Sequence, residues 1–308
     1  MRRAALAAIA AALLVASVSA CGGGDGGSEP RGETANRDTG LDSSRSSKPA
    51  IVWAVGDGAD GERFAPRVAR LVERGKPDRF LYLGDVYEDG TKEEFKNNYA
   101  PVFGRFADVT APTPGNHEWG LRDEGYRPYW KKIIGKDIPD YYRFSLAGWD
   151  ILSLNSEAPH DESSAQVRWL RSNLPGDGTC RLAFWHRPRF SFGEHGDQPD
   201  VTPLWNALRG RATLIVNGHE HNMERFARRD GITELVAGSG GRGIYKINPE
   251  ERAQLEFGND TDFGALRLKL KPGRADYRFV AVDGRTLDSG SVRCKRSTES
   301  DSQPVSAY

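Results

Sequence analysis

Short apolar runs alternate with amphipathic stretches over the first part of the chain. The runs at residues 51–55 and 79–85 are apolar and lead into Gly and Asp, a pattern typical of buried strands that end in loops. Between them, apolar residues recur at helical spacing over residues 63–75, where a Gly ends the pattern. A second helix is predicted near residues 91–103, and a short strand enters the segment 112–120. Strand, helix and strand therefore alternate.

The rest of the chain is richer in strand patterns. Residues 141–157 contain two β-rich runs joined by Ala-Gly, which predicts an antiparallel hairpin. Helices are predicted near residues 164–174 and 201–210. Further strands are predicted at residues 181–186, 212–221, 232–240, 264–273, 275–284 and 287–294. An α/β half that grades into a β-rich half predicts a layered α/β sandwich of mixed sheets with helices outside.

The two ends of the chain lack these patterns. Residues 1–20 combine an Arg pair with an unbroken run of apolar and small residues, as secretory signals do. This run closes with "VSAC", which resembles the lipobox of bacterial lipoproteins, so we expect Cys21 to carry a lipid. A transmembrane anchor is the alternative, although the run is short and Ala-rich for a span. Residues 21–50 are predicted to be a disordered polar tether, and residues 297–308 a flexible tail.

The segment between these ends, residues 51–296, is expected to be one domain. No Pro/Gly/Ser-rich linker divides it, and two independent domains are the alternative. The signal predicts a location outside the cytoplasm, either anchored to a membrane through Cys21 or secreted. Cys180 and Cys294 are the remaining cysteines. Because such compartments are oxidising, we expect a disulfide between them, with two separate thiols as the alternative.

Overall charge bears on the choice of partner. Lys plus Arg and Asp plus Glu both number 43, so bulk charge predicts no nucleic-acid binding. Any polyanion would have to be recognised locally. The sequence makes no prediction of oligomeric state.

Most of the chemically capable side chains directly follow predicted strands. The segments "VGDG", "LGDVYEDG", "PGNHE", "FWHRP" and "NGHEH" present Asp57, Asp85, Tyr87, Asn116, His117, His186, His219 and His221. In open α/β sheets, ligand sites gather at the carboxyl ends of strands. Taken singly, an Asp after a strand is usually a turn former or a helix cap, and a lone His is usually just hydrogen-bonded.

The combination of residue types favours a metal site. His219 and His221 are two residues apart, so an extended chain directs both side chains to one side. Carboxylates, an amide and a third histidine join them. Such a mixture of oxygen and imidazole donors suits Fe, Mn or Zn better than Ca or Mg, which prefer oxygen alone.

The order of these motifs resembles that of a known family. Gly-Asp, Gly-Asp, Gly-Asn-His-Glu, His and Gly-His-x-His follow one another from Gly56 to His221, as in the calcineurin-like metallophosphoesterase superfamily. "GDG", with a tyrosine near the second aspartate, is most similar to the purple acid phosphatase branch. The resemblance covers about residues 51–292. It implies a four-layer αββα sandwich of two mixed sheets flanked by helices, and a metal-dependent phosphomonoesterase with two ions of Fe, Mn or Zn.

The resemblance also assigns ligands by matching motif. The assignments are Asp57 and His221 for one ion, Asn116, His186 and His219 for the other, and Asp85 as the bridge. The first ion's site departs from the family pattern. The family's tyrosine stands three residues after the second aspartate, whereas Tyr87 is one place earlier, and Ala59 replaces a histidine of related enzymes. We expect Tyr87 to bind the first ion through a tightened loop; a water in its place, or a ring packed beneath the site, is the alternative.

Further residues are candidates for catalysis and substrate binding. His117 follows a ligand and is placed like the family's leaving-group histidine. His195 resembles the histidine that meets substrate oxygens in purple acid phosphatases; an exposed loop residue is the alternative. Arg187 and Arg189 would grip a phosphate by paired hydrogen bonds, or otherwise be solvated. The Gly-rich segment 237–243 lacks the Lys-Ser/Thr ending of a phosphate loop and is expected to be a tight turn near the site.

Three functions follow from these residues. The first is a phosphatase that releases phosphate from organic esters outside the cytoplasm. The second is a phosphodiesterase acting on nucleotides or phospholipid headgroups, since the pocket-shaping segment 118–140 carries no readable pattern. The third is a catalytically inactive surface-binding lipoprotein whose site changed near Ala59 and Tyr87. The full set of ligand residues argues for the enzyme.

Overall fold

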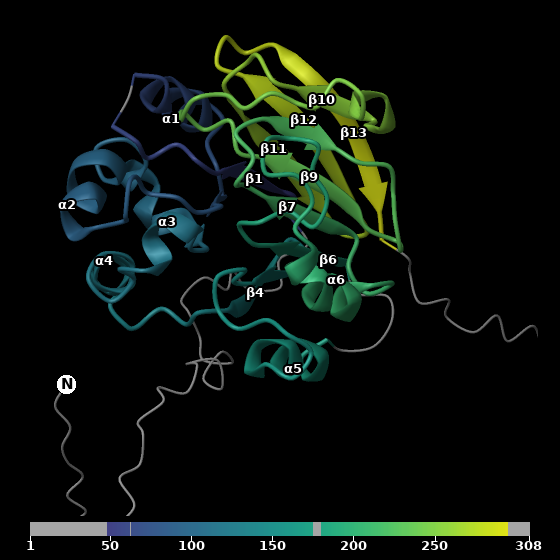
Figure 1. Cartoon of the computed structure of the whole chain (residues 1–308), viewed down its shortest axis with the longest axis horizontal. Coiled ribbons are helices and arrows are strands. Elements are labelled where there is room, and N and C mark those ends of the chain that lie inside the picture. Colours follow the sequence, from purple (N-terminus) through teal and green to yellow (C-terminus); the bar gives the residue numbers. More distant parts are fainter. Residues whose placement is uncertain (1–47, 62, 175–179, 295–308) are drawn as a thin grey trace, which may run out of the picture.

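The strands form two mixed β-sheets (Figure 1). The computed structural model describes residues 48–61, 63–174 and 180–294. One sheet has the strand order β13 (Thr286–Arg293), β12 (Arg274–Ala281), β11 (Gly264–Lys271), β1 (Ala50–Val55), β2 (Arg79–Tyr82) and β3 (Thr110–Pro112). The other has the order β10 (Phe257–Asn259), β8 (Met223–Arg225), β9 (Thr233–Ala237), β7 (Leu214–Asn217), β6 (Cys180–Phe184), β5 (Trp149–Ser153) and β4 (Tyr142–Leu146).

The hydrophobic pattern of a strand differs between the parallel and antiparallel parts of the sheets. β1, β2 and β3 are parallel to one another, as are β5, β6, β7 and β9. Every residue of β2 and β7 is buried, which explains their apolar runs without alternation. β11 pairs antiparallel with both β1 and β12, and its buried and half-buried residues alternate. Such alternation is typical of a strand with one face in the core and the other toward solvent.

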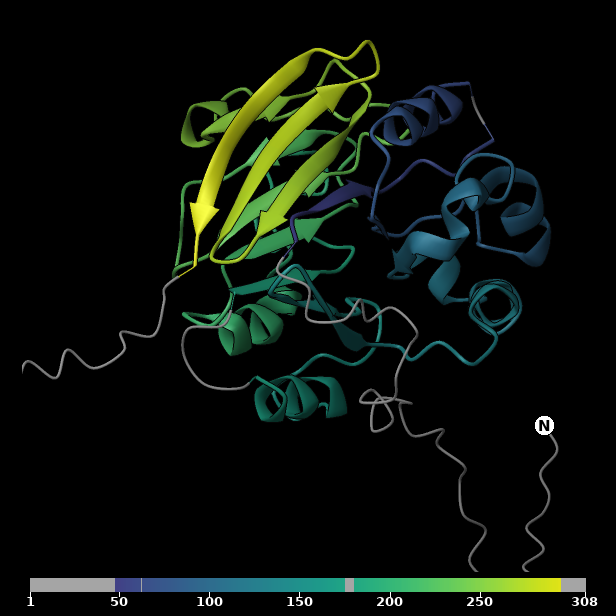
Figure 2. The same cartoon turned by 180° about the vertical axis from the view of Figure 1, so that it is seen from behind.

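Helices cover part of the outer face of each sheet. The longer helices are α1 (Ala65–Arg74), α4 (Tyr126–Ile134), α5 (Ala165–Ser172) and α6 (Thr202–Leu208). Short helical segments are α2 (Lys92–Glu94), α3 (Asn116–Trp119), the π-helix η1 (Phe95–Tyr99) and the 3-10 turns η2 (Gly104–Val109), η3 (Pro199–Val201) and η4 (Arg252–Gln254). α1 packs on β11, and α5 and α6 lie beside each other on the seven-stranded sheet (Figures 1 and 2).

Two apolar cores hold these layers together. One core lies between the sheets, where it includes Val52, Leu268, Leu182 and Val216, and it extends to the buried face of α1. The second core joins the other face of the seven-stranded sheet, including Ile215, to α5 and α6. The layers are therefore helix, sheet, sheet and helix, which confirms the predicted sandwich.

The structure departs from the sequence expectation between residues 91 and 140. The helix expected over residues 91–103 is divided into α2 and η1. Thr91 and Glu94 cap each other reciprocally and start α2. The segment 118–140, for which no pattern was readable, contains α4, whose Tyr129 and Trp130 pack edge-on against Tyr99 at centroid distances of 5.4 and 5.6 Å. Aromatic packing with distant residues, rather than local periodicity, therefore defines this region.

Two short strands, β8 and β10, were also not predicted. Each has three residues, which is too short for a periodic signal, and each is held by pairing with a neighbour.

The chain ends complete the description. Cys180 and Cys294 form a disulfide, as expected. The predicted signal (residues 1–20), Cys21 and most of the tether lie outside the described residues, as does the whole predicted tail (residues 297–308). Within the described part of the chain, no helix has the length and hydrophobicity that a membrane span requires.

Candidate metal centre

The predicted ligands lie at one edge of the sandwich, where strands of both sheets end. Asp57, Asp85 and Asn116 follow β1, β2 and β3 of the six-stranded sheet, whereas His186 and His219 follow β6 and β7 of the other sheet. Because the strands are parallel within each group, their carboxyl ends share one edge. The site is therefore assembled from both sheets.

Strained and crowded backbone brings these loops together. Asp57, Asp85 and His219 have φ angles of 61°, 69° and 70°, in the left-handed region that non-glycine residues seldom adopt. A Cβ at Gly115 would collide with Asp85 Oδ1, and one at Gly218 would lie 2.8 Å from Asp57 Oδ2. Strain of this kind clusters at functional sites, where the surrounding structure holds it in place.

Three predicted ligands of the first ion converge. The Tyr87 hydroxyl lies 2.9 Å from His221 Nε2 and 3.3 Å from Asp57 Oδ1. His221 Nε2 lies 3.7 Å from Asp57 Oδ1. The Tyr87 hydroxyl thus points into the cluster even though the residue stands one place earlier than in the family pattern.

The predicted ligands of the second ion surround His186 Nε2. Asn116 Oδ1 is 3.0 Å from this nitrogen, His219 Nδ1 is 3.1 Å away, and Asp85 Oδ1 is 3.4 Å away. Atoms that each bind one ion at about 2.1 Å lie about 3 to 3.5 Å apart, so these separations are those of ligands to a common ion. Asp57, Asp85 and His186 also offer ligand atoms that all lie within 4.8 Å of one another, which brings the two groups together.

Backbone carbonyls determine which ring nitrogen of two histidines faces the site. His186 Nδ1 is 2.8 Å from the carbonyl oxygen of Leu83, and His221 Nδ1 is 2.8 Å from that of Gly243. A carbonyl only accepts hydrogen bonds, so each Nδ1 donates its proton and each ring turns its Nε2 to the other predicted ligands. Metal-binding histidines in proteins are held in this way.

This donor set fits a cation. His186 Nε2, Asn116 Oδ1, Asp85 Oδ1 and His219 Nδ1 are four potential ligand atoms that face one another. Both Asp57 and Asp85 are buried, and a buried carboxylate needs a compensating positive charge. The residues therefore fit the metal ions that the motifs predict, with Asp85 between the two groups.

The pKa shifts differ among the histidines of the cluster. Burial lowers the pKa of His186, but the carboxylates of Asp85 and Asp57 outweigh burial and raise it to about 10, so a metal ion would bind its Nε2 by displacing a proton. Burial lowers the pKa of His221 to about 4 and holds that of His219 well below its usual range. His219 and His221 are thus neutral at ordinary pH, which is the form that binds metal.

His117 lies at the rim beside the proposed bridge. Its backbone N–H donates to Asp85 Oδ1, and its Nε2 lies 3.8 Å from Asp85 Oδ2. Its side chain is 31% exposed, so the ring is accessible from the solvent. The buried carboxylate of Glu118 instead accepts the backbone N–H groups of Asp85 and Val86, and so holds the loop that carries Asp85.

Three buried acids fix the loop that leads from His186 to His195. Glu234 accepts from the backbone N–H groups of residues 189 and 190, Glu224 from that of residue 192, and Glu220 from that of His195. The His195 ring consequently lies 4.3 Å from the His219 ring, centroid to centroid, with 40% of its side chain exposed. His195 is therefore an exposed loop residue, which was the alternative to a substrate-binding role, but its ring lies beside His219, a predicted ligand.

The two arginines of this loop are engaged by carboxylates. Arg187 Nε lies 2.9 Å from Glu157 Oε1, and the positive charge of Arg187 contributes to the low pKa of His219. Arg189 lies 3.4 Å from Asp197 and over the Phe190 ring. The structure thus places Arg187 near the cluster and shows Arg189 bound to its own loop.

Two neighbours of the site have no signal in the motifs. The Tyr245 ring stacks on His221 at a centroid distance of 3.8 Å, and the Arg242 guanidinium lies 4.6 Å from the centroid of the Tyr87 ring. Both belong to the segment after β9, which also donates the Arg242 N–H to the Asp57 carbonyl. The Gly-rich turn at residues 237–243 is therefore next to the site, as predicted.

The fold and the grouped ligands define the metallophosphatase class of α/β sandwich. The sequence profile of the calcineurin-like phosphoesterase family matches residues 50–223, more than half of the chain. The chain belongs to this family.

The relatives include acid phosphatases. Purple acid phosphatase 21 of Arabidopsis thaliana is 23% identical over 257 residues, which cover 73% of this chain and 58% of that protein. Tartrate-resistant acid phosphatase type 5 of Sus scrofa is 22% identical over 152 residues, which cover 45% and 44%. The chain thus spans about half the length of the relatives it matches.

A solved structure shares the fold. The structure of a purple acid phosphatase from yellow lupin (Lupinus luteus) seeds matches with a TM-score of 0.68 at 16% identity, covering 81% of this chain and 54% of that one. The resemblance predicted from the motifs is confirmed in both sequence and fold.

Proposed function

We propose that this protein is a dinuclear metal-dependent hydrolase of phosphate monoesters that acts outside the cytoplasm. The observation that carries the proposal is the convergence of potential ligand atoms in two groups, Tyr87 with His221 and Asn116 with His186, on either side of Asp85. The likeness to two acid phosphatases supports the monoester as substrate. The mixed oxygen and nitrogen donors favour Fe, Mn or Zn.

Bound metals would supply a Lewis acid for the phosphoryl oxygens and lower the pKa of a bound water to generate the nucleophile. Asp57, Tyr87 and His221 would hold one ion, and Asn116, His186 and His219 the other. The chain contributes no side-chain nucleophile to this reaction.

Two exposed histidines would act on the substrate. His117 Nε2, beside Asp85 and accessible from the rim, is placed to donate a proton to the leaving oxygen. His195, held over His219 through its backbone bond to Glu220, is placed to donate to phosphoryl oxygens. Arg187 would add positive charge from beside Glu157, to whose two carboxylate oxygens its Nε donates.

The location proposed for this activity depends on the two ends of the chain. The signal-like residues 1–20 and the lipobox-like Cys21 support export and anchoring at a membrane surface. The Cys180–Cys294 disulfide supports an oxidising compartment.

The test is elemental analysis of the full chain together with hydrolysis of para-nitrophenyl phosphate and bis(para-nitrophenyl) phosphate. We expect about two metals per chain, a faster reaction with the monoester, and loss of both metal and activity in His219→Ala and Asn116→Ala. A matched control is Asn206→Ala, because Asn206 is exposed on α6. Hydrolysis that survives either ligand substitution, or preference for the diester, contradicts the proposal.

A further inference from the structure

The outer face of β11, β12 and β13 is strongly basic. The inward residues of β11, such as Leu266 and Leu268, are buried in the core between the sheets. The alternate positions of the three strands point away from this core and carry Arg267, Lys269, Lys271, Arg274, Arg278 and Arg293, with Asp276 as the one carboxylate among them.

The strand register places like charges directly opposite one another. Arg267 pairs with Arg278 across β11 and β12, and Arg274 lies between Lys271 and Arg293. Like charges in directly opposite positions destabilise a sheet. The three strands therefore carry an arrangement that folding alone does not favour.

Carboxylates neutralise only some of the Lys and Arg side chains on this basic face. Asp276 pairs with Lys271 at 3.0 Å and with Arg274 at 2.6 Å. Among the described residues, no carboxylate lies within ion-pair distance of Lys269, Arg278 or Arg293. Several unpaired positive charges thus lie together on this face, although the overall charge of the chain is balanced.

The face is open and shallowly hollowed. In Figure 2, β12 and β13 are seen from outside with no described helix in front of them. A depression of about 440 Å³ lies over the strands, and serine and glycine of β13, namely Ser289, Gly290 and Ser291, form part of its wall. The face contains no exposed aromatic side chain on which a base would stack, since Tyr277 is 7% exposed and packs against Gly290.

The chain enters the fold beside this face. β1 begins at Ala50, opposite Leu270 and next to the row formed by Lys271, Arg274 and Arg293. Any attachment of the preceding residues to a membrane would hold this end of the sheet near the lipid surface. The metal centre lies beyond the opposite end of β1.

We propose that the basic face of β11–β13 docks on an anionic lipid surface. The negative surface attracts each nearby Lys or Arg, and the contributions add. Docking would orient the domain so that β1 starts near the membrane. The proposal does not depend on the metal centre, because none of these side chains belongs to it.

The test measures vesicle co-sedimentation of the full chain carrying Cys21→Ser, which removes the predicted lipid acceptor. Vesicles of phosphatidylcholine alone are compared with vesicles containing about one third phosphatidylglycerol, so that any binding by the apolar residues 1–20 appears in both. The test variant is the triple substitution Lys269→Gln, Arg278→Gln and Arg293→Gln.

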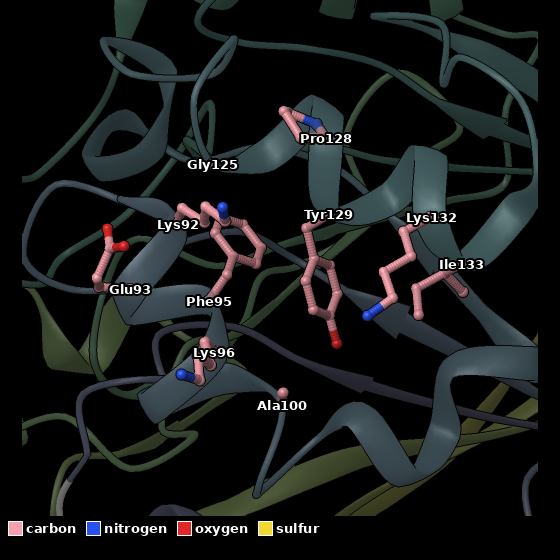
Figure 3. Close-up of a pocket in the computed structure, with 10 residues that line it drawn as sticks. All are labelled: Lys92, Glu93, Phe95, Lys96, Ala100, Gly125, Pro128, Tyr129, Lys132 and Ile133. Atoms are coloured by element: carbon pink, nitrogen blue, oxygen red, sulfur yellow. The ribbon is translucent and has the colours of Figure 1, made fainter.

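A matched control removes three lysines elsewhere. Lys92, Lys96 and Lys132 surround a different cavity of about 510 Å³, which lies between α2, η1 and α4 and is walled by Phe95 and Tyr129 (Figure 3). The control is the triple substitution Lys92→Gln, Lys96→Gln and Lys132→Gln. It changes the net charge by the same amount as the test variant.

We expect preferential binding to the anionic vesicles, on the order of 100-fold weaker in the test variant, and unchanged in the control. High salt should abolish the preference. Equal binding to both vesicles, an equal loss in the control, or binding to soluble heparin without binding to vesicles overturns the proposal. Hydrolysis of para-nitrophenyl phosphate by the test variant should equal that of the unsubstituted chain, so a failure of the proposed function is visible separately.

Discussion

Two groups of charged residues differ in nearly every physical respect. At the strand-end edge, carboxylates and histidines are buried and mixed in sign, and each side chain has a defined partner atom. On the basic face of β11–β13, cations predominate, are partly exposed, and several have no ion-pair partner among the described residues. Buried charge requires matched geometry because unpaired groups cost much free energy there, whereas exposed charge acts through its sum.

The comparison predicts different responses to substitution. Removing one side chain from the buried cluster should greatly reduce activity and metal binding, and the reduction should depend little on salt concentration. Removing one cation from the exposed face should change stability and vesicle binding only slightly, and the change should become smaller at high salt concentration.

The largest expected effect is that of removing the bridging carboxylate. Asp85→Asn should lower kcat/KM for para-nitrophenyl phosphate by more than about 1000-fold and reduce the metal content, because both proposed ions lose a ligand. The matched substitution Asp276→Asn, on the basic face, should leave kcat/KM unchanged. Equal losses in the two variants would contradict the assignment of Asp85.

The next largest effect tests whether Tyr87 binds metal or only packs beneath the site. Tyr87→Phe should weaken metal binding about 10- to 100-fold, measured by competition with a chelator, because the hydroxyl beside Asp57 and His221 is lost. With ferric iron it should also remove visible absorbance. Tyr245→Phe, whose ring would still stack on His221, is the control. Unchanged affinity and colour in Tyr87→Phe would mean that the ring packs beneath the site without binding metal.

A smaller effect concerns the dependence of stability on pH. Burial raises the pKa of Glu234 to about 8, although the backbone N–H groups of Arg189 and Phe190 act against it. The folded state therefore keeps a proton that the unfolded chain loses above its ordinary pKa of about 4.5. Stability from this group is complete below pH 4.5 and is lost as pH rises toward 8.

Thermal unfolding measures whether stability falls as pH rises, as expected for Glu234. Between pH 5 and 6.5, the Tm of the unsubstituted chain should fall by a few degrees more than that of Glu234→Gln, which corresponds to about 2 kcal/mol. Glu256→Gln, at an exposed carboxylate, should follow the unsubstituted chain. Parallel pH profiles for Glu234→Gln and the unsubstituted chain would show that folding does not raise the pKa of Glu234.

The comparison also shows which features a sequence reveals. The strands, and the grouping of the candidate ligands that follow them, were predicted because apolar runs, glycines and metal-binding residue types are adjacent in sequence. The basic face was missed although Arg267, Lys269 and Lys271 alternate visibly. Its charge becomes apparent only when strand register places Arg278 and Arg293 beside them.

Supporting contacts around the metal centre were also hidden. The acceptors of the His186 and His221 Nδ1 protons are backbone carbonyls of Leu83 and Gly243, and a carbonyl carries no sequence signature. Glu224 and Glu234 resemble ordinary polar positions of strands until the structure places backbone N–H groups of the His195 loop against them. Long-range geometry, rather than residue type, determines these roles.

The smallest effect concerns the stability of the basic face itself. Arg278→Glu places a carboxylate opposite Arg267, replacing a repulsive pair by an attractive one. It should raise the free energy of unfolding by about 0.5 kcal/mol at low salt and by less at high salt, measured by urea denaturation. Arg209→Glu makes the same charge change but loses an ion pair with Asp230, so it should be slightly destabilising. Destabilisation by Arg278→Glu would mean that Arg267 and Arg278 do not repel each other. A higher free energy of unfolding together with weaker vesicle binding would show that the positive charges of this face lower the stability of the fold and also attract it to an anionic surface.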